Sequence, residues 1–368
     1  MPMSDQEKEL QVLRNQIDAI DSQIHTLFNE RARCAQRVAE VKQKYQGKQE
    51  AVFYRPEREA QVLRRVMERN EGPLADKEVA RLFREIMSVC LALEEPMRVA
   101  FLGPEGTFTQ QAVNKHFGHS AHCIPFDSTD EVFREVEAGG AHYGVVPIEN
   151  STEGMVNHTL DLFKRFNLQI CGEVELRIHH HLLRAGATDI RGITRIYSHQ
   201  QSLAQCRSWL DSHFPSVERI AVSSNAEAAR LAAAEGAQVA AIAGDLAADL
   251  YQLNVVTRNI EDQPDNTTRF LIIGDQQVDK SGQDKTSILV SARNKPGALY
   301  ELLEHFHSHK ISLTRIETRP GGQGAWNYMF YIDFEGHFSD DNVQRVLKKL
   351  ESESVELKLL GSYPVAVL

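Results

Sequence analysis

An arginine interrupts an apolar stripe near the N-terminus of this 368-residue chain. The stripe repeats in steps of three and four, the spacing of one helix face, and comprises Leu10, Leu13, Ile17, Ile20, Ile24, Leu27, Cys34, Val38 and Val41. The position that continues it between Leu27 and Cys34 is Arg31. A guanidinium on a buried stripe is costly unless an anion meets it. Arg31 therefore predicts either an anionic-ligand site inside a helical core or a buried ion pair with a distant carboxylate.

Other charged side chains border the same expected core. Arg14 and Lys42 flank the stripe towards its two ends. In the following segments Glu59 shares the face of the apolar positions, Arg58 lies beside it, and Glu94 closes the last helix. Surface solvation could explain any one of them, but together with the arginine on the stripe they favour a pocket for a polyanion.

Polar segments follow short apolar runs at four places further along the chain. They read GPEGTF (103–108), PIENS (147–151), SHQQ (198–201) and DNTTRF (265–270). Helix capping or turn chemistry could explain each one alone. Four such strand ends in one α/β unit favour a cleft that binds a ligand.

Two further motifs lie near the C-terminus. NKPGAL (294–299) begins a helix after a strand, with Asn294 suited to the cap, and ETRP (317–320) ends the next strand. Capping and hairpin closure would account for both locally.

Three helices are expected over residues 5–95, and the first runs from about residue 5 to 45. At 1.5 Å per residue the first helix would be about 60 Å long. This length exceeds the width of a small domain, so we expect the helix to pack along a second copy of itself.

Two further segments with different patterns follow the helices. Between residues 98 and 274 short apolar runs alternate with helical stretches, which predicts an α/β unit with a largely parallel sheet in two lobes. Residues 286–363 follow the α+β order β-α-β-β-α-β of a ferredoxin-like fold. The expected domains are 1–95, 97–275 and 285–363.

Composition excludes several classes of protein. The net charge is −10, from 51 acidic and 41 basic side chains with no long basic run, so no nucleic-acid partner is expected. The chain begins without an apolar signal core, and no stretch approaches about 18 apolar residues. We therefore expect a cytoplasmic chain with no membrane partner. The five scattered cysteines are expected to be reduced.

No cofactor is expected either. The chain has no G-x-G-x-x-G motif and no P-loop lysine, which disfavours a dinucleotide. His179, His180 and His181 would alternate faces on a strand, so they cannot all reach one metal ion.

The helical segment resembles the all-helical chorismate mutases, whose site draws cations from both subunits of an intertwined dimer. The resemblance implies that chorismate is held by residues at matching positions: Arg14 from the partner, Arg31, Lys42, Arg58 and Glu59. Lys42 would stabilise charge developing on the ether oxygen during the Claisen rearrangement to prephenate. Glu94 stands where one well-known pattern has Gln, so it must be protonated to donate a hydrogen bond. Arg55 and Cys90 replace an acid and a hydroxyl found in some members.

The four strand-end motifs, in this order, closely resemble prephenate dehydratase. That family has a two-lobed fold like the periplasmic binding proteins and converts prephenate to phenylpyruvate by decarboxylating dehydration. The resemblance makes Thr268 the main catalytic residue and Arg269 a carboxylate partner. The pocket would also contain Thr107, Asn150, Ser151, Ser198, His199 and Gln205.

The C-terminal motifs look like those of the ACT regulatory domain of prephenate dehydratases, which binds phenylalanine between two subunits. The implied effector contacts are Asn294, Gly297, Ala298, Leu299, Glu317, Thr318 and Arg319. The whole chain thus resembles the bifunctional chorismate mutase–prephenate dehydratases, and we expect a homodimer or larger assembly inhibited by phenylalanine. Two alternatives remain: a non-catalytic amino-acid sensor, and a mutase–prephenate dehydrogenase fusion.

Overall fold

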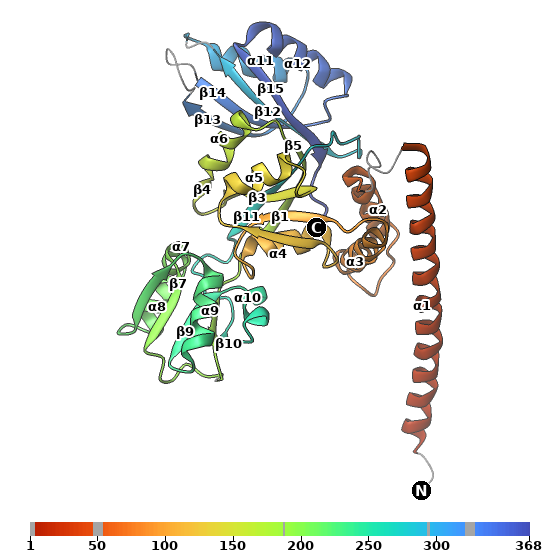
Figure 1. Ribbon diagram of the computed structural model, residues 1–368, viewed down its shortest axis with the longest axis vertical. Helices are drawn as coiled ribbons and strands as arrows, with labels where there is room; N and C mark the ends of the chain where they lie inside the picture. The colour runs from red at the N-terminus through yellow and green to blue at the C-terminus, as the bar shows by residue number, and fades with distance from the viewer. Residues whose placement is uncertain (1–3, 47–53, 187, 293–294, 321–327) are drawn as a thin grey trace.

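The computed structural model describes residues 4–46, 54–186, 188–292, 295–320 and 328–368. A helical region, a two-lobed α/β region and a C-terminal α+β region follow one another along the chain (Figure 1). None of the helices in these ranges is both long and apolar enough to span a membrane.

The helical region contains the three predicted helices, α1 (Asp5–Gln46), α2 (Pro56–Glu68) and α3 (Asp76–Glu94). Pro56 begins α2, where its missing N–H would have no helical partner in any case. With 42 residues, α1 is about 63 Å long. It packs against α3, and its N-terminal part extends away from the rest of the molecule (Figure 1).

The apolar stripe of α1 is exposed in the single chain. Its side chains between positions 10 and 27 are 40–60% exposed, and they are Leu10, Leu13, Ile17, Ile20, Ile24 and Leu27. A contiguous apolar surface of this length is typical of an interaction site.

The first lobe is built on a mixed sheet of order β2-β1-β3-β11-β5, with the short β4 paired to β3. Its strands are β1 (Arg98–Leu102), β2 (His122–Phe126), β3 (Tyr143–Asn150), β4 (Gly154–Met155), β5 (Gln169–Arg177) and β11 (Thr267–Gly274). The strands β1, β2 and β3 run parallel, but β11 is antiparallel to both β3 and β5. The prediction of a largely parallel sheet is therefore wrong, because β11 returns from the second lobe in the opposite direction and the sheet of the second lobe also contains antiparallel pairs. Three helices complete this lobe: α4 (Phe108–Phe117), α5 (Thr129–Glu137) and α6 (Asn157–Arg165).

The second lobe is inserted between β5 and β11. Its sheet has the order β10-β6-β9-β7-β8, with β6 (His181–Arg184), β7 (Arg195–His199), β8 (Glu218–Val222), β9 (Val239–Ala243) and β10 (Asn254–Thr257). Its helices are α7 (Gln200–Gln205), α8 (Arg207–His213), α9 (Asn225–Glu235) and α10 (Asp245–Leu250). The chain passes between the lobes twice, which confirms the predicted two-lobed arrangement (Figure 1).

The C-terminal region has the predicted ferredoxin-like order. Its elements are β12 (Asp284–Ala292), α11 (Ala298–Ser308), β13 (Leu313–Pro320), β14 (Tyr328–Glu335), α12 (Asp341–Glu353) and β15 (Glu356–Pro364), and the antiparallel sheet order is β13-β14-β12-β15. Alternate residues of β12 serve two cores. Ile288 and Val290 pack with the two helices, whereas Leu289 packs with Phe163 and other residues of the first lobe. This sheet is thus continuous with the core of the α/β region.

We expect the stripe on α1 to mediate self-association. The substitution Ile20→Glu places a charge at its centre and should lower the molecular mass measured by size-exclusion chromatography with light scattering. Ser22→Glu is the matched control, because Ser22 lies about 200° further round the helix. Equal masses for the two variants would contradict this role of the stripe.

Candidate active sites

The candidate dehydratase site begins with two neighbouring strand ends in the first lobe. Asn150 on β3 and Thr268 on β11 are directly opposite in the antiparallel register. Asn150 Nδ2 donates to Thr268 Oγ1 at 2.8 Å, and both residues are only 9% exposed. The strand pairing itself therefore brings together two of the predicted site residues.

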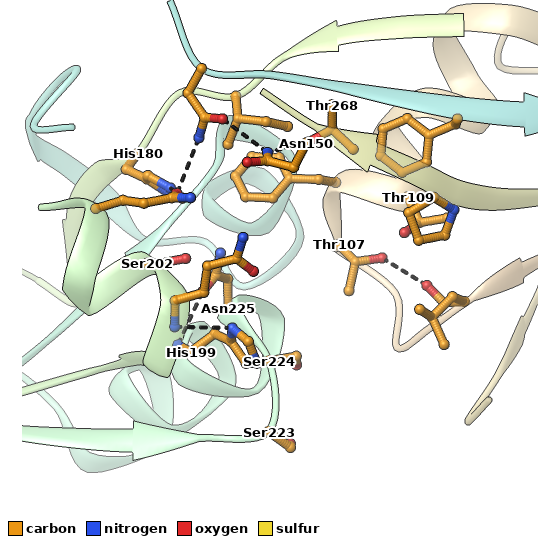
Figure 2. A pocket seen from close by; sticks show the side chains of 18 of the residues that line it. Thr107, Thr109, Asn150, His180, His199, Ser202, Ser223, Ser224, Asn225 and Thr268 are labelled. Atoms are coloured by element: carbon orange, nitrogen blue, oxygen red, sulfur yellow. Dashed lines mark hydrogen bonds between the residues drawn. The ribbon is translucent and has the colours of Figure 1, made fainter. Parts of the chain in front are cut away.

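These two side chains face a cavity of about 240 Å³ between the lobes. Figure 2 shows Asn150 and Thr268 on one side, with His199, Ser224 and Asn225 on the other. Five of the predicted prephenate residues line it: Thr107, Asn150, His199, Gln205 and Thr268. Apolar surface comes from Phe108, Ile178 and Phe270. The cavity thus combines a polar end with walls that suit a carbon ring.

Several of these residues also organise local structure. Thr107 caps α4, where its Oγ1 accepts from the N–H of Gln110, and His199 Nδ1 accepts from the N–H of Gln201 at the start of α7. Thr107 and His199 thus each cap a helix and also line the cavity.

Two predicted residues support the cavity without lining it. Ser198 is fully buried, and its hydroxyl contacts the Ile242 carbonyl at 2.8 Å and Asn225 Oδ1 at 3.0 Å. Since Asn225 lines the cavity, Ser198 acts on the site through it. Ser151 Oγ accepts from the N–H of Thr267 at 3.0 Å, at the end of the β3–β11 pair. The prediction that both serines lie in the pocket is wrong in this structure.

Arg269 does not face the cleft. Successive side chains of a strand point to opposite faces, so the residue after Thr268 turns towards the C-terminal sheet. Its guanidinium is buried and donates to Glu173 at 2.8 Å, Asp333 at 2.6 Å and the Tyr363 hydroxyl at 3.0 Å. Burial opposes its charge, but Tyr363, Asp333 and Glu173 together raise the pKa of Arg269. The predicted role as a carboxylate partner for substrate is therefore wrong, because protein carboxylates already occupy this arginine.

The helical region brings together part of the predicted mutase site. Lys42 Nζ lies 4.0 Å from Glu94 Oε2, and both side chains are largely buried. Arg31 is half-buried and donates to the carbonyl of Ile86 at 3.4 Å. Burial raises the pKa of Glu94 against the opposing effect of Lys42 and Arg31. Arg31 thus lies on the side of the core that holds Lys42 and Glu94.

Three other predicted mutase residues lie at varying distances from this cluster. Cys90 is buried one turn before Glu94 on α3. Arg55 is 44% exposed and pairs with Asp279 at 3.3 Å. Arg14 is exposed and lies about 25 Å along α1 from Arg31. Arg14 is therefore too far from Arg31 to share one site with it within a single chain.

Glu59 and Arg58 are outside the cluster in a single chain. Glu59 pairs with Arg84 at 3.4 Å, in a small cavity beside Tyr54 and His116 where α2 meets the first lobe. Burial raises the pKa of Glu59 while Arg84 lowers it. Arg58 is exposed. The expected grouping of Glu59 with Lys42 is thus not found here, because Arg84 provides a nearer cation.

The predicted effector residues divide into two groups on either side of β13. Gly297, Ala298, Leu299 and Thr318 line an open pocket of about 350 Å³, together with Tyr328 and Phe330. Arg319 lies on the opposite face of β13, where it pairs with Asp161 of α6 at 2.7 Å, and Glu317 shares that face. Arg319 is therefore a link between domains in this structure rather than part of the pocket. Asn294 lies outside the described residues.

Family models match each region of the chain. One described as "Chorismate mutase type II" matches residues 13–95, one described as "Prephenate dehydratase" matches 99–278, and one described as "ACT domain" matches 286–352. A bifunctional chorismate mutase/prephenate dehydratase of Pseudomonas aeruginosa is 62% identical over 100% of both chains. This chain belongs to the bifunctional chorismate mutase/prephenate dehydratase family.

More distant relatives and solved structures agree with this membership. The bifunctional enzyme of Neisseria gonorrhoeae is 52% identical and covers 96% of this chain and 97% of its own. A prephenate dehydratase from Arthrobacter aurescens, solved in complex with L-Phe, is 36% identical, with a TM-score of 0.67 over 73% of this chain and 90% of that chain. A structure described as a novel type of quorum quenching acylase has the same TM-score at 27% identity, covering 73% of this chain and 98% of that chain. One fold thus carries two described activities, so the site residues must carry the argument for function.

Asn266 and His180 are among the cavity residues that were not predicted as site residues. Asn266 lies within the DNTTRF motif, and His180 lies within the run of three histidines; both line the cavity. The three histidines have separate partners: His179 contacts Glu261 at 2.9 Å, His180 contacts Gln205 at 2.9 Å and His181 lies 3.3 Å from Asp245. His179 and His180 lie between β5 and β6 rather than on a strand as expected, and of the three histidines only His180 lines the cavity.

We expect Arg269→Met to lower the free energy of unfolding by about 3–5 kcal/mol, because it leaves the buried Asp333 without a cation and Glu173 with Lys285 alone. Urea unfolding followed by circular dichroism measures the change. Arg177→Met on the adjacent strand β5 is the control, since Arg177 is 52% exposed and its pair with Asp265 should contribute less than about 1 kcal/mol. Similar losses for the two variants would contradict the structural role of Arg269.

Proposed function

We propose that the chain rearranges chorismate to prephenate in its helical region and converts prephenate to phenylpyruvate in the interlobe cleft. Phenylalanine would inhibit through the C-terminal region. The observation that carries this proposal is the hydrogen bond between Asn150 and Thr268 inside the cavity. Membership in the bifunctional family and the three matched models support it.

The dehydratase reaction needs little acid–base chemistry. Prephenate loses carbon dioxide and its ring hydroxyl together, and formation of an aromatic ring drives both losses. Thr268 Oγ1 accepts from Asn150, so its own hydrogen is left to point towards another group. A threonine hydroxyl is a weak acid, so hydrogen bonding to the departing oxygen is its proposed role. Phe108, Ile178 and Phe270 would exclude water around the ring.

The mutase reaction requires only binding of the compact conformer and stabilisation of charge. A Claisen rearrangement moves no proton, so the enzyme accelerates it through orientation and electrostatics. Lys42 and protonated Glu94 would donate to the ether oxygen, and Arg31 would hold a carboxylate. Because Arg14 lies too far away on its own chain, the site would be completed by the exposed α1 stripe pairing with a second copy. We therefore propose a homodimer as the smallest active assembly.

The pocket beside α11 is the proposed effector site. Gly297 precedes α11 with φ = 84°, a left-handed conformation that favours glycine. The helix therefore starts with its first N–H groups next to the pocket, where a carboxylate of phenylalanine could bind. Inhibition requires that phenylalanine bind one arrangement of the chain more tightly than the active one.

A coupled assay tests the proposal against its alternatives. Chorismate added to the purified full chain should yield phenylpyruvate, detected by its absorbance in alkali. A sensor would bind phenylalanine without turnover. A mutase–dehydrogenase would require NAD and form its reduced product. Absence of phenylpyruvate with both chorismate and prephenate would refute the proposal.

We expect Thr268→Ala to abolish phenylpyruvate formation from prephenate while the rearrangement of chorismate continues. The hydroxyl that assists hydroxide departure is lost, whereas the helical site is distant in the chain. Thr267→Ala is a suitable control, because the neighbouring hydroxyl contacts the Asp265 carbonyl at 3.3 Å and is not among the residues lining the cavity. Retained dehydratase turnover in T268A would remove Thr268 from the mechanism.

The rearrangement should become faster as the pH falls from 8 towards 5. Burial raises the pKa of Glu94, so its donating acid form is populated below that pKa and is lost as the pH rises through it. Stopped or continuous assays of chorismate loss give the profile. Glu94→Gln carries a permanent donor and should be insensitive to pH over this range. A flat profile in the wild type would exclude Glu94 as the donor.

A further inference from the structure

A chain of side-chain amides crosses the dehydratase cleft, and its hydrogen-bond directions can be assigned from one end. The N–H groups of Thr152 and Glu153 both point at Asn150 Oδ1, at 3.0 and 3.1 Å. Backbone N–H groups can only donate, so this atom must be the amide oxygen. Asn150 Nδ2 is then the donor to Thr268 and, at 2.9 Å, to Asn266 Oδ1.

The donor-to-acceptor direction of these hydrogen bonds continues into the second lobe. Because Asn266 accepts through its oxygen, its Nδ2 donates to Gln205 Oε1 at 3.1 Å. That oxygen also lies 2.9 Å from His180 Nε2, so His180 must carry its hydrogen on Nε2. Burial lowers the pKa of His180 and so favours the neutral ring. His180 Nδ1 is consequently a hydrogen-bond acceptor.

The hydrogen-bonded amides leave atoms around the cavity whose role as donor or acceptor is fixed. Among the described residues, His180 Nδ1 and Gln205 Nε2 are buried without a hydrogen-bond partner. Both residues line the cavity, and His180 is only 1% exposed. An unpaired buried polar atom is costly, so a ligand is the natural partner for each. The amide chain therefore leaves two donors, Thr268 Oγ1 and Gln205 Nε2, and one acceptor, His180 Nδ1, at its end of the cavity.

We propose that Asn266 is a positioning residue that fixes which of these atoms, on both lobes, donate hydrogen bonds and which accept them. It accepts from Asn150 on the first lobe and donates to Gln205 on the second. The inference rests on the proposed dehydratase function. Prephenate has two carboxylates and a ketone that only accept, and a single ring hydroxyl that can donate. Two donors and one acceptor match this substrate, with His180 Nδ1 as the acceptor for the ring hydroxyl.

Asn266 is well placed for this role. It is 2% exposed, and its carbonyl accepts from the N–H of Ile178 at 2.8 Å, which ties it to the crossing between the lobes. The titratable groups around the amide chain are few. His180 faces it from one side, with Glu261 bound to the His180 backbone, and Asp265 precedes it in sequence and pairs with Arg177.

Asn266→Asp tests the inference because the two side chains have the same shape but different hydrogen-bonding capacity. An ionised carboxylate accepts only, so it can receive from Asn150 but cannot donate to Gln205. Its protonated form restores one donor. We expect kcat for phenylpyruvate formation in N266D to fall about 100-fold at pH 8, the usual cost of misplacing one catalytic donor, and to recover at least tenfold towards pH 5 relative to wild type.

The controls separate polarity from packing. Asn266→Ala should lose activity at every pH without recovery, and Asn266→Ser, whose hydroxyl can accept and donate, should retain more than N266A. Chorismate loss at the helical site and a cooperative thermal transition report folding for each variant. If N266D does not fold, the comparison of N266S with N266A decides the question.

Failure of the role proposed for Asn266 can be distinguished from failure of the proposed dehydratase function. No phenylpyruvate from wild-type chain refutes the dehydratase assignment itself. With an active wild type, any one of three results overturns the role of Asn266. The first is a kcat of N266D within threefold of wild type at all pH values. The others are one shared pH profile for N266D and N266A, and equal activity of N266S and N266A.

Discussion

The antiparallel pairing of β3 with β11 positions both the cleft residues and the contacts of the first lobe with the C-terminal sheet. The register sets Asn150 opposite Thr268 and Glu149 opposite Arg269. Because consecutive side chains of a strand point to opposite faces, the first pair faces the cleft and the second pair lies on the opposite face of the sheet. There Arg269 binds Asp333 of β14, and Glu149 pairs with Arg315 of β13. The same two strands therefore build the active site and hold the regulatory sheet.

This arrangement gives a physical route between an effector and the reaction. Glu173 on β5 accepts from Arg269 and from Lys285 of β12, so three strands of the first lobe are tied by charge to the C-terminal sheet. A buried cluster of this kind is held in one geometry, since removing any partner leaves a charge without compensation. A ligand that moves the C-terminal sheet would act on Thr268 through the backbone of the residue next to it.

The sequence predicted much of this site, and its errors have clear physical causes. Motif spacing placed Asn150 and Thr268 at strand ends and Thr107 at the start of a helix, and the fold brings all three to one cavity. Gln205, at the end of α7, followed from the family resemblance alone. Arg269 was wrongly predicted to bind substrate because it follows Thr268 in sequence, whereas strand alternation turns its side chain to the other face of the sheet. Asn266 went unnoticed because its importance comes from partners 116 and 61 positions away in sequence. The sheet directions also depended on where the chain returns from the second lobe, which local patterns do not encode.

The helical region shows a different limit, because the proposed mutase site is divided between two chains. The stripe on α1 places Arg31 on the same face as its apolar neighbours, yet those neighbours are exposed from Leu10 to Leu27. The cost of burying a guanidinium therefore applies only after a second surface covers the stripe. Arg31 is already half-buried near Glu94, at the end of α1 that packs on α3, while Arg14 projects from the uncovered end. A helix that buries one arginine within its own chain and offers another at the far end is suited to share two equivalent sites with a partner related by twofold symmetry.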